Sequence, residues 1–334
     1  LASFSKEAIS TSEKIPVSGS EVKVIEGIVA LPAPKLATVV DEVTKWEVEE
    51  AKREMDKRMA KILGRENKEG FATLAEAREI LGDRLFGPEE LEKAGLSVEE
   101  IPDIPFTTEQ LEMFKQKGID VILYTDKLPD GKDLTGISLI EFFKNTQKGC
   151  TSIILNDIGW YKAERFFTIE TPILKWKAVS REIIADSTSK NYLEQTKVLL
   201  DYVKSLYKDE NDIPDTIKEM LYETDEILHD SAFTQDALSS DEKKWKPATK
   251  RLAGLGITQS FRESFIENLY RMVVVNRVNN EQLLNSVYSW TKSLTSVGDL
   301  VYSGYFDDAG AGVDGGGPDG SGSVIGCVFS ADQL

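Results

Sequence analysis

The feature that most constrains this chain is a concentration of glycine near its C-terminal end. Nine glycines lie between Gly304 and Gly326, flanked by β-branched and aromatic runs at 300–306 and 324–329. The flanking runs predict strands, whereas glycine favours turns and loops because it tolerates backbone conformations closed to other residues. We therefore predict a strand–loop–strand unit, with an ordered loop anchored by Val313 and tolerant of change at its tip.

The composition is that of a globular chain. Its 334 residues, 41% of them hydrophobic, suffice for two domains with cores. The net charge of −17 disfavours nucleic-acid binding, because proteins that bind a phosphate backbone place clustered Lys and Arg on one face. Here basic residues alternate with acidic ones, as between Lys52 and Lys61. No apolar run reaches the roughly 18–20 residues that span a bilayer, and residues 1–4 lack the features of a signal peptide. We expect no membrane span, and a cytoplasmic or virion-associated location.

Residues 1–70 are predicted to form a polar arm, a strand and a long helix. Residues 1–20 are polar, and 21–31 alternate as a strand does before two prolines. From Lys35 to Leu63 apolar residues recur at helical spacings, which predicts an amphipathic helix. Its apolar stripe needs a partner, so the helix and the arm offer a route to a homo-oligomer.

Residues 71–118 are predicted to form a small helical block, because they carry clear helix boundaries. The boundary signals are Thr73 with Glu76 for a helix through Leu81, Gly87-Pro88 for the next helix, and Thr107 or Thr108 for a helix from there to Lys117, before Gly118.

Residues 119–334 are predicted to form an α+β domain. Strands are expected at 121–124 and 150–155, and extended structure around Trp176 between residues 166 and 179. Helices are expected at 139–145, 189–207 and 261–275, and β-type runs at 287–290, 300–306 and 324–329. An acidic helical insertion is expected near 209–248, with breaks at Pro214 and Pro247.

Catalytic motifs are scarce. His229 is the single histidine, and the sequence contains no Gly-x-Ser-x-Gly nucleophile motif for which it could act as the base. We expect His229 to be a solvated helix residue. Cys150 and Cys327 are too few for zinc or a disulfide framework and are expected to be free thiols. Gly310–Gly315 matches the letters of a dinucleotide fingerprint, but Gly-Gly-Pro follows where a helix is required. We expect the protein to bind no cofactor and to have no enzymatic activity. An enzyme that uses a pair of carboxylates ranks third, after a binding protein and a structural subunit.

Two acidic loops raise the question of calcium. Neither has the spacing of an EF-hand or its closing Glu, so solvated turn aspartates are favoured and no metal site is predicted. The two sets are Asp126, Asp130 and Asp133, and Asp307, Asp308, Asp314 and Asp319.

The C-terminal run carries a family resemblance. The segment VYSGYFDDAGAGV from Val301 to Val313, a polar loop, and VIGCVFS from Val324 to Ser330 resemble the end of a bacterial family common in the candidate phyla. That family has a C-type-lectin-like fold related to the formylglycine-generating-enzyme type and to the variable proteins of diversity-generating retroelements. Upstream segments that agree are Leu81–Pro88, Ile101–Phe106, Phe166-Phe167, Trp176, Val179, Ser187–Lys190 with Gln195, Leu283-Leu284, Tyr288 and Thr291–Ser293.

Two departures from the family pattern matter. The closing Ser-Arg of the family is Ser330-Ala331 here, and its Arg-x-Asp-Asn loop is replaced by residues 318–322. The resemblance does not imply oxidase chemistry, because the enzymes of this fold need reactive cysteines in this region and Cys327 is alone.

The resemblance implies a non-enzymatic ligand-binding or display protein with a variable surface loop and a protein or surface ligand. The alternative is a structural subunit of a virion or other particle, suggested by the N-terminal arm, strand and helix. The candidate binding residues are Tyr302, Tyr305, Asp307, Asp308, Asp314, Asp319 and Ser321.

Overall fold

The computed structural model describes residues 70–146, 159–234, 238 and 242–334. The chain divides into two units, Leu1–Glu66 and Asn67–Leu334, and the described residues all lie in the second. The predicted arm, strand 21–31, helix 35–63 and strand 150–155 fall outside the described residues. Helices and two mixed sheets make the second unit an α+β structure, as predicted. Among the helices described, none is long and apolar enough to cross a bilayer.

Capping side chains set the boundaries of the first helices. The elements are α2 (Leu74–Leu81), the 3₁₀ turn η1 (Gly82–Arg84), β1 (Leu85–Phe86), α3 (Pro88–Ala94) and α4 (Thr108–Lys117). The Thr73 hydroxyl accepts from the Glu76 amide and the Glu76 carboxylate accepts from the Thr73 amide, which confirms the predicted capping box. Thr107, rather than Thr108, caps α4 in the same way, and Gly118 ends it in the left-handed conformation.

The first sheet has the strand order β1-β2-β3-β8 and joins distant parts of the chain. Its longer strands, β2 (Ile119–Tyr124) and β3 (Lys175–Ser180), are antiparallel, while β8 (Ser330–Ala331) pairs with β3 and β1 lies parallel to β2. The block predicted at 71–118 therefore contributes an edge strand to this sheet. Every residue of β2 is buried, so the predicted strand at 121–124 is confirmed and extended.

The extended structure predicted around Trp176 is confirmed by β3, but it does not reach back to Phe166. A short helix, α6 (Arg165–Thr168), precedes β3. Its side chains Phe166 and Phe167 both contact Phe265, with ring centroids 5.0 and 6.2 Å away. Successive side chains of a strand point to opposite faces, so two adjacent rings reach one partner more readily from a helical turn.

The second sheet has the order β6-β5-β4-β7. It consists of β4 (Tyr288–Leu294), β5 (Leu300–Asp307), β6 (Gly310–Gly316) and β7 (Ile325–Gly326). The residues of β6 were predicted to belong to a loop, and this prediction was wrong. The glycines of β6 allow a neighbouring side chain to pack closely on the strand, since a Cβ on Gly312 would lie 2.6 Å from the Tyr288 hydroxyl. The segment that matches a dinucleotide fingerprint therefore lies in a strand, and a turn follows it.

The run 324–329 does not form one strand as predicted. β7 pairs with β4 in the second sheet, and four residues later β8 pairs with β3 in the first. Cys327, Val328 and Phe329 lie between them and are buried. The segment crosses from one sheet to the other, so burial on all sides rather than strand pairing explains its apolar character.

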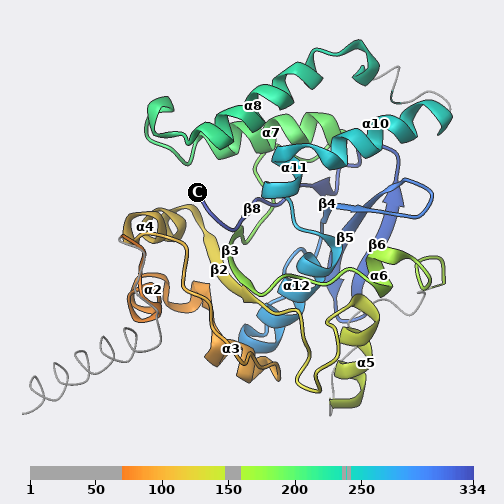
Figure 1. Ribbon diagram of the computed structural model, residues 1–334. Helices are drawn as coiled ribbons and strands as arrows, with labels where there is room; N and C mark the ends of the chain where they lie inside the picture. Colours follow the sequence, from red (N-terminus) through yellow and green to blue (C-terminus); the bar gives the residue numbers. More distant parts are fainter. Residues whose placement is uncertain (1–69, 147–158, 235–237, 239–241) are drawn as a thin grey trace, which may run out of the picture. The chain divides into compact units, whose positions relative to one another are not determined.

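Helix α12 (Phe265–Asn279) lies between the two sheets (Figure 1) and contacts β2, β4 and β5. An amphipathic helix at 261–275 was predicted, but every residue from Phe265 to Val275 is buried, because both sides of α12 face a sheet. The helix begins at Phe265 because Ser264 is its N-cap, and the preceding residues form the separate helix α11 (Gly256–Phe261).

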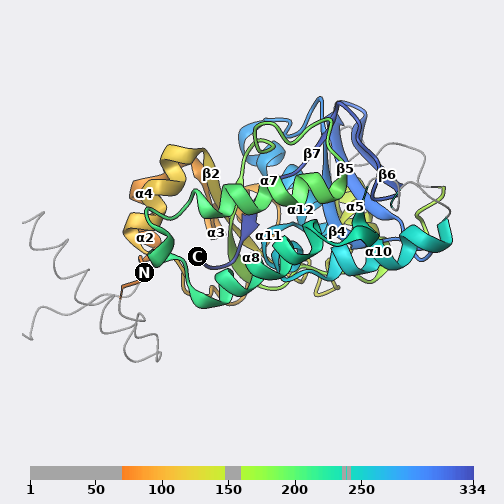
Figure 2. The ribbon, with the colours of Figure 1, turned by 90° about the horizontal axis from the view of Figure 1, so that it is seen from above.

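A layer of helices covers one end of the unit. It comprises α7 (Tyr192–Lys204), α8 (Asp215–Leu228), α10 (Glu242–Gly254) and α11, and Figure 2 shows α7 beside α8. The segment predicted as an acidic insertion includes α8, which buries Ile217, Leu221 and Ile227. The break predicted at Pro247 was wrong: this proline lies inside α10. A proline removes one backbone donor, and the burial of Leu252 and Ala253 favours the helix.

Two further predicted elements form. Helix α5 (Gly136–Thr146) contains the helix predicted at 139–145, and α7 is the shorter form of the one predicted at 189–207. His229 follows α8 as its C-cap and is exposed, in agreement with its prediction as a solvated residue.

Candidate functional site

Four aromatic side chains form a row on the outer face of the second sheet. Trp290 contacts Tyr302 with ring centroids 4.7 Å apart, and Tyr288 contacts both Tyr302 and Tyr305 at 5.2 Å. Exposure rises along the row from 2% for Trp290 to 39% for Tyr305. One end of the row is therefore fixed in the core, and the other end is open to solvent.

A β-bulge in β5 brings Tyr305 into this row. The register between β5 and β6 shifts between Gly304 and Asp307, and Tyr305 has a φ of 49°, in the left-handed region. Tyr302 points outward and Ser303 is buried, so regular alternation would turn Tyr305 inward. Instead Tyr305 and Asp307 are exposed, and Phe306 is buried. A bulge re-aims the side chains that follow it, and here it places two tyrosines of β5 on one face.

Two glycines make this geometry fit. A Cβ on Gly304 would lie 2.3 Å from the Val287 carbonyl oxygen, so this position accepts no side chain. Opposite Gly304 on β6 lies Gly312, whose missing side chain leaves room for the Tyr288 ring. The glycines of this region thus shape the aromatic row, in addition to forming turns.

Carboxylates lie among the tyrosines. Asp314 is directly opposite Tyr302 in the β5–β6 register. Burial, and then the negative charge of Asp314, raise the pKa of Tyr302. Burial also raises the pKa of Tyr288, assisted by Asp314, Tyr305 and Asp307. Both hydroxyls therefore stay protonated at neutral pH and act as donors to a ligand or to the carboxylates.

The two carboxylates have local partners but no counter-ion. The Asp307 carboxylate accepts from the Ala309 amide at 2.8 Å, and that of Asp314 accepts from the Gly315 amide at 2.8 Å. Within the described part of the chain, neither is paired with a Lys, Arg or His nitrogen within 4.0 Å. Both side chains are exposed, so this face carries negative charge that no basic side chain of the described residues pairs with.

A buried polar network holds β5 from behind. The Ser303 hydroxyl donates to the Asn268 side-chain oxygen at 3.1 Å, and the Asn268 amide donates to Glu263 at 3.1 Å. Glu263 also accepts three hydrogen bonds from Arg271, two from its Nε and one from its Nη2, and one from the hydroxyl of Tyr124 in β2. The network ties both sheets to α12 next to Tyr302 and so makes the site rigid.

The structure brings together only part of the predicted site. Tyr302, Tyr305, Asp307 and Asp314 share the outer face, whereas the side chain of Asp308 accepts from Gln282 at 2.8 Å in the adjoining turn. Asp319 and Ser321 lie in the β6–β7 loop, and no hydrogen bond or ring contact described here joins them to the row.

The sequence prediction omitted Tyr288 and Trp290 from the site. Their i, i+2 spacing places them on one face of a strand, and this was the available signal.

No group of three or more His, Cys, Asp or Glu side chains in the described residues has the geometry to hold a metal ion. Cys327 is a fully buried free thiol, and burial raises its pKa. A thiol so placed is chemically inert.

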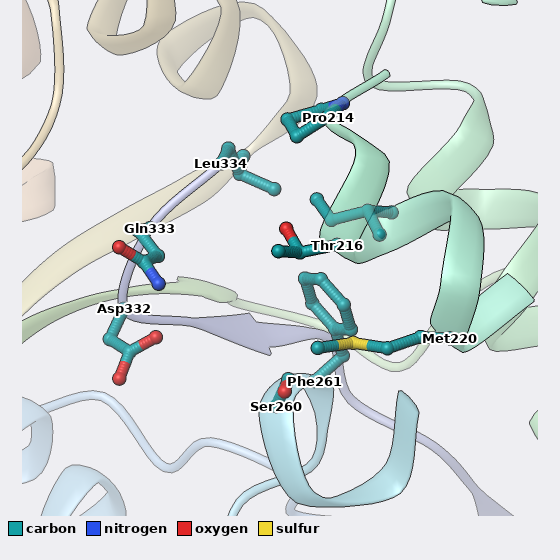
Figure 3. Close-up of a pocket in the computed structure, with 9 residues that line it drawn as sticks. Pro214, Thr216, Met220, Ser260, Phe261, Asp332, Gln333 and Leu334 are labelled. Carbon is teal, nitrogen blue, oxygen red and sulfur yellow. The ribbon is translucent and has the colours of Figure 1, made fainter. Parts of the chain in front are cut away.

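A cavity of about 210 Å³ lies elsewhere, between α8, α11 and the last residues of the chain (Figure 3). Its charged side chain, Asp332, already pairs with Lys175 at 2.6 Å. The cavity is lined by Pro214, Thr216, Ile217, Met220, Ser260, Phe261, Asp332, Gln333 and Leu334. The sequence analysis did not anticipate it, because its walls come from segments far apart in the chain.

Comparison of this chain with protein-family models, with curated proteins and with solved structures finds no match. The resemblance to the C-type-lectin-like family therefore stays a prediction.

Proposed function

We propose that this protein is a non-enzymatic ligand-binding or display protein, with a C-type-lectin-like domain that binds its ligand on the tyrosine face. The tyrosine face consists of Tyr288, Tyr302 and Tyr305 together with Asp307 and Asp314. The observation that carries the proposal is the bulge at Gly304. It holds Tyr305 at a φ of 49° and places it 5.2 Å from Tyr288. Strain of this kind persists where the surrounding structure enforces it, and it gathers at functional sites.

The composition of the face supports binding rather than catalysis. Tyrosine offers a large contact area and loses little conformational entropy, which is why it is enriched in antibody combining sites. The rings lie on paired strands that a buried network supports, and sites built on such elements are held more accurately than sites on loops. The adjoining loop, residues 317–323, offers small and polar side chains at the rim, where substitutions cost little stability.

The test uses two variants that alter the face and spare the fold. Gly312→Val places a side chain where the Tyr288 ring lies, and the backbone at Gly312 is not in the left-handed region. Tyr305→Gly removes the exposed ring and relieves the positive φ. Tyr222→Ala is the matched control, because Tyr222 is 67% exposed on α8.

We expect ligands selected on the full chain from a random peptide library or a glycan array to lose at least about tenfold in affinity to both face variants. Their affinity for Tyr222→Ala should match that for the parent chain, and all four proteins should melt at similar temperatures. Ligands that bind the parent, Gly312→Val and Tyr305→Gly equally would contradict the proposal.

A further inference from the structure

We infer that the tyrosine face takes a cationic polypeptide segment, with arginine or lysine side chains as the groups recognised. This inference rests on the proposed function and adds the class of ligand. Tyrosine rings attract an ammonium or guanidinium group through the negative potential of the ring face. Carboxylates beside those rings supply the opposite charge and accept hydrogen bonds from the same group. The tyrosine face contains both aromatic rings and carboxylates, so a single cationic group can contact both.

The ring arrangement suits a flat cation. Tyr288 and Tyr305 are tilted by 33° from each other, whereas Tyr302 stands at 80° to Tyr288. The first pair is therefore partly stacked, with Tyr305 as the more exposed ring, and Tyr302 stands edge-on beside Tyr288. A guanidinium group stacks on an exposed ring such as Tyr305 and presents its N–H groups sideways. Asp314 lies opposite Tyr302 and Asp307 follows Tyr305 on the same face, so acceptors border the rings.

The charge of the face selects among ligand classes. Asp307 and Asp314 are exposed and have no basic partner in the described residues. Burial raises the pKa of Tyr288, and the nearby carboxylates of Asp314 and Asp307 raise it further. A phosphate or an acidic peptide would be repelled here, whereas a basic segment gains at both the rings and the carboxylates. The chain charge of −17 also steers a cation towards the protein.

The test measures the affinity of the full chain for two fluorescent peptides by polarisation. One is an arginine–glycine repeat. The other carries citrulline, a neutral analogue of the same shape, at each arginine. We expect the arginine peptide to bind at least about tenfold more tightly. Raising the salt from about 0.05 to about 0.5 M should remove most of the difference, because screening weakens exposed ion pairs.

Two double variants separate the face from the overall charge. Asp307→Asn with Asp314→Asn should lose at least about tenfold in affinity for the arginine peptide. The control variant, Asp215→Asn with Asp225→Asn, removes the same number of charges from α8, where these side chains are 96% and 69% exposed. It should keep the affinity of the parent chain for the arginine peptide. Equal losses in both double variants would show attraction by bulk charge alone and would overturn the inference.

The other outcomes decide between this inference and the proposed function. Equal affinity for the citrulline peptide, or a neutral oligosaccharide that binds in a Tyr305-dependent manner while the arginine peptide does not, would overturn the cationic ligand. Either result would leave the proposed function standing, because that function is tested separately, by the affinity of selected ligands for Gly312→Val and Tyr305→Gly. The proposed function itself falls if selected ligands ignore both Gly312→Val and Tyr305→Gly.

Discussion

Replacing Glu263 with glutamine is expected to lower the free energy of unfolding by about 3–5 kcal/mol. Glu263 and Arg271 are both fully buried, and the carboxylate is 3.0 Å from the guanidinium. Tyr124 and Asn268 donate to the same carboxylate. The glutamine variant leaves the charge of Arg271 in the core without a counter-ion, and this cost exceeds that of losing one hydrogen bond. Urea denaturation followed by tryptophan fluorescence measures the change.

The control is a double variant, Glu263→Leu with Arg271→Met, which removes both charges and keeps most of the volume. It should be more stable than Glu263→Gln, because no unpaired charge remains. If the double variant is no more stable than Glu263→Gln, the unpaired charge of Arg271 does not account for the effect.

Acid should remove a second contribution, of about 3 kcal/mol, that comes from Glu267. Burial acts to raise the pKa of this carboxyl, but Lys177 and Lys292 outweigh burial and lower it from 4.5 to about 2. The Lys177 ammonium lies 2.9 Å from the carboxylate, and both side chains are buried. Because the pKa in the folded state is depressed, the contribution is complete above about pH 4.5. It is lost as the pH falls through 4.5 towards 2.

The readout is the stability difference between the parent chain and Glu267→Gln, measured in urea at a series of pH values. Glutamine still accepts from the Ser264 amide at the start of α12, so the helix cap is kept. We expect the difference to be largest near neutral pH and to shrink as the solution approaches pH 2. A difference that does not vary with pH would show that the charge of Glu267 is not the cause.

Predictions that rest on neighbours in the chain were the most accurate. The capping box at Thr73, the proline start of α3 and the glycine stop of α4 each depend on residues within a turn of one another. The buried strand β2 follows from its own apolar run. Local hydrogen bonds and steric limits act over three or four residues, so a short window of sequence contains the information.

The candidate site was predicted only in part, for a related reason. Tyr302 and Tyr305 were chosen from the sequence, but alternation alone would place them on opposite faces of a strand. At the bulge, the Val287 carbonyl from another segment accepts a hydrogen bond from the Tyr305 amide and occupies the space that a side chain on Gly304 would need. Tyr288 was missed because its place in the row depends on the pairing of β4 with β5.

The sequence by itself determined the α+β class, the ends of the first helices, and the strand β5 that precedes the glycine-rich segment. Tertiary structure alone decided that this segment forms β6, that the run 324–329 crosses between two sheets, and that α12 is buried on every side from Phe265 to Val275. It also paired Arg271 and Glu267 with buried partners of opposite charge. The physical reason is that capping and turn chemistry are local, whereas close packing, strand register and charge pairing depend on segments that only the fold brings together.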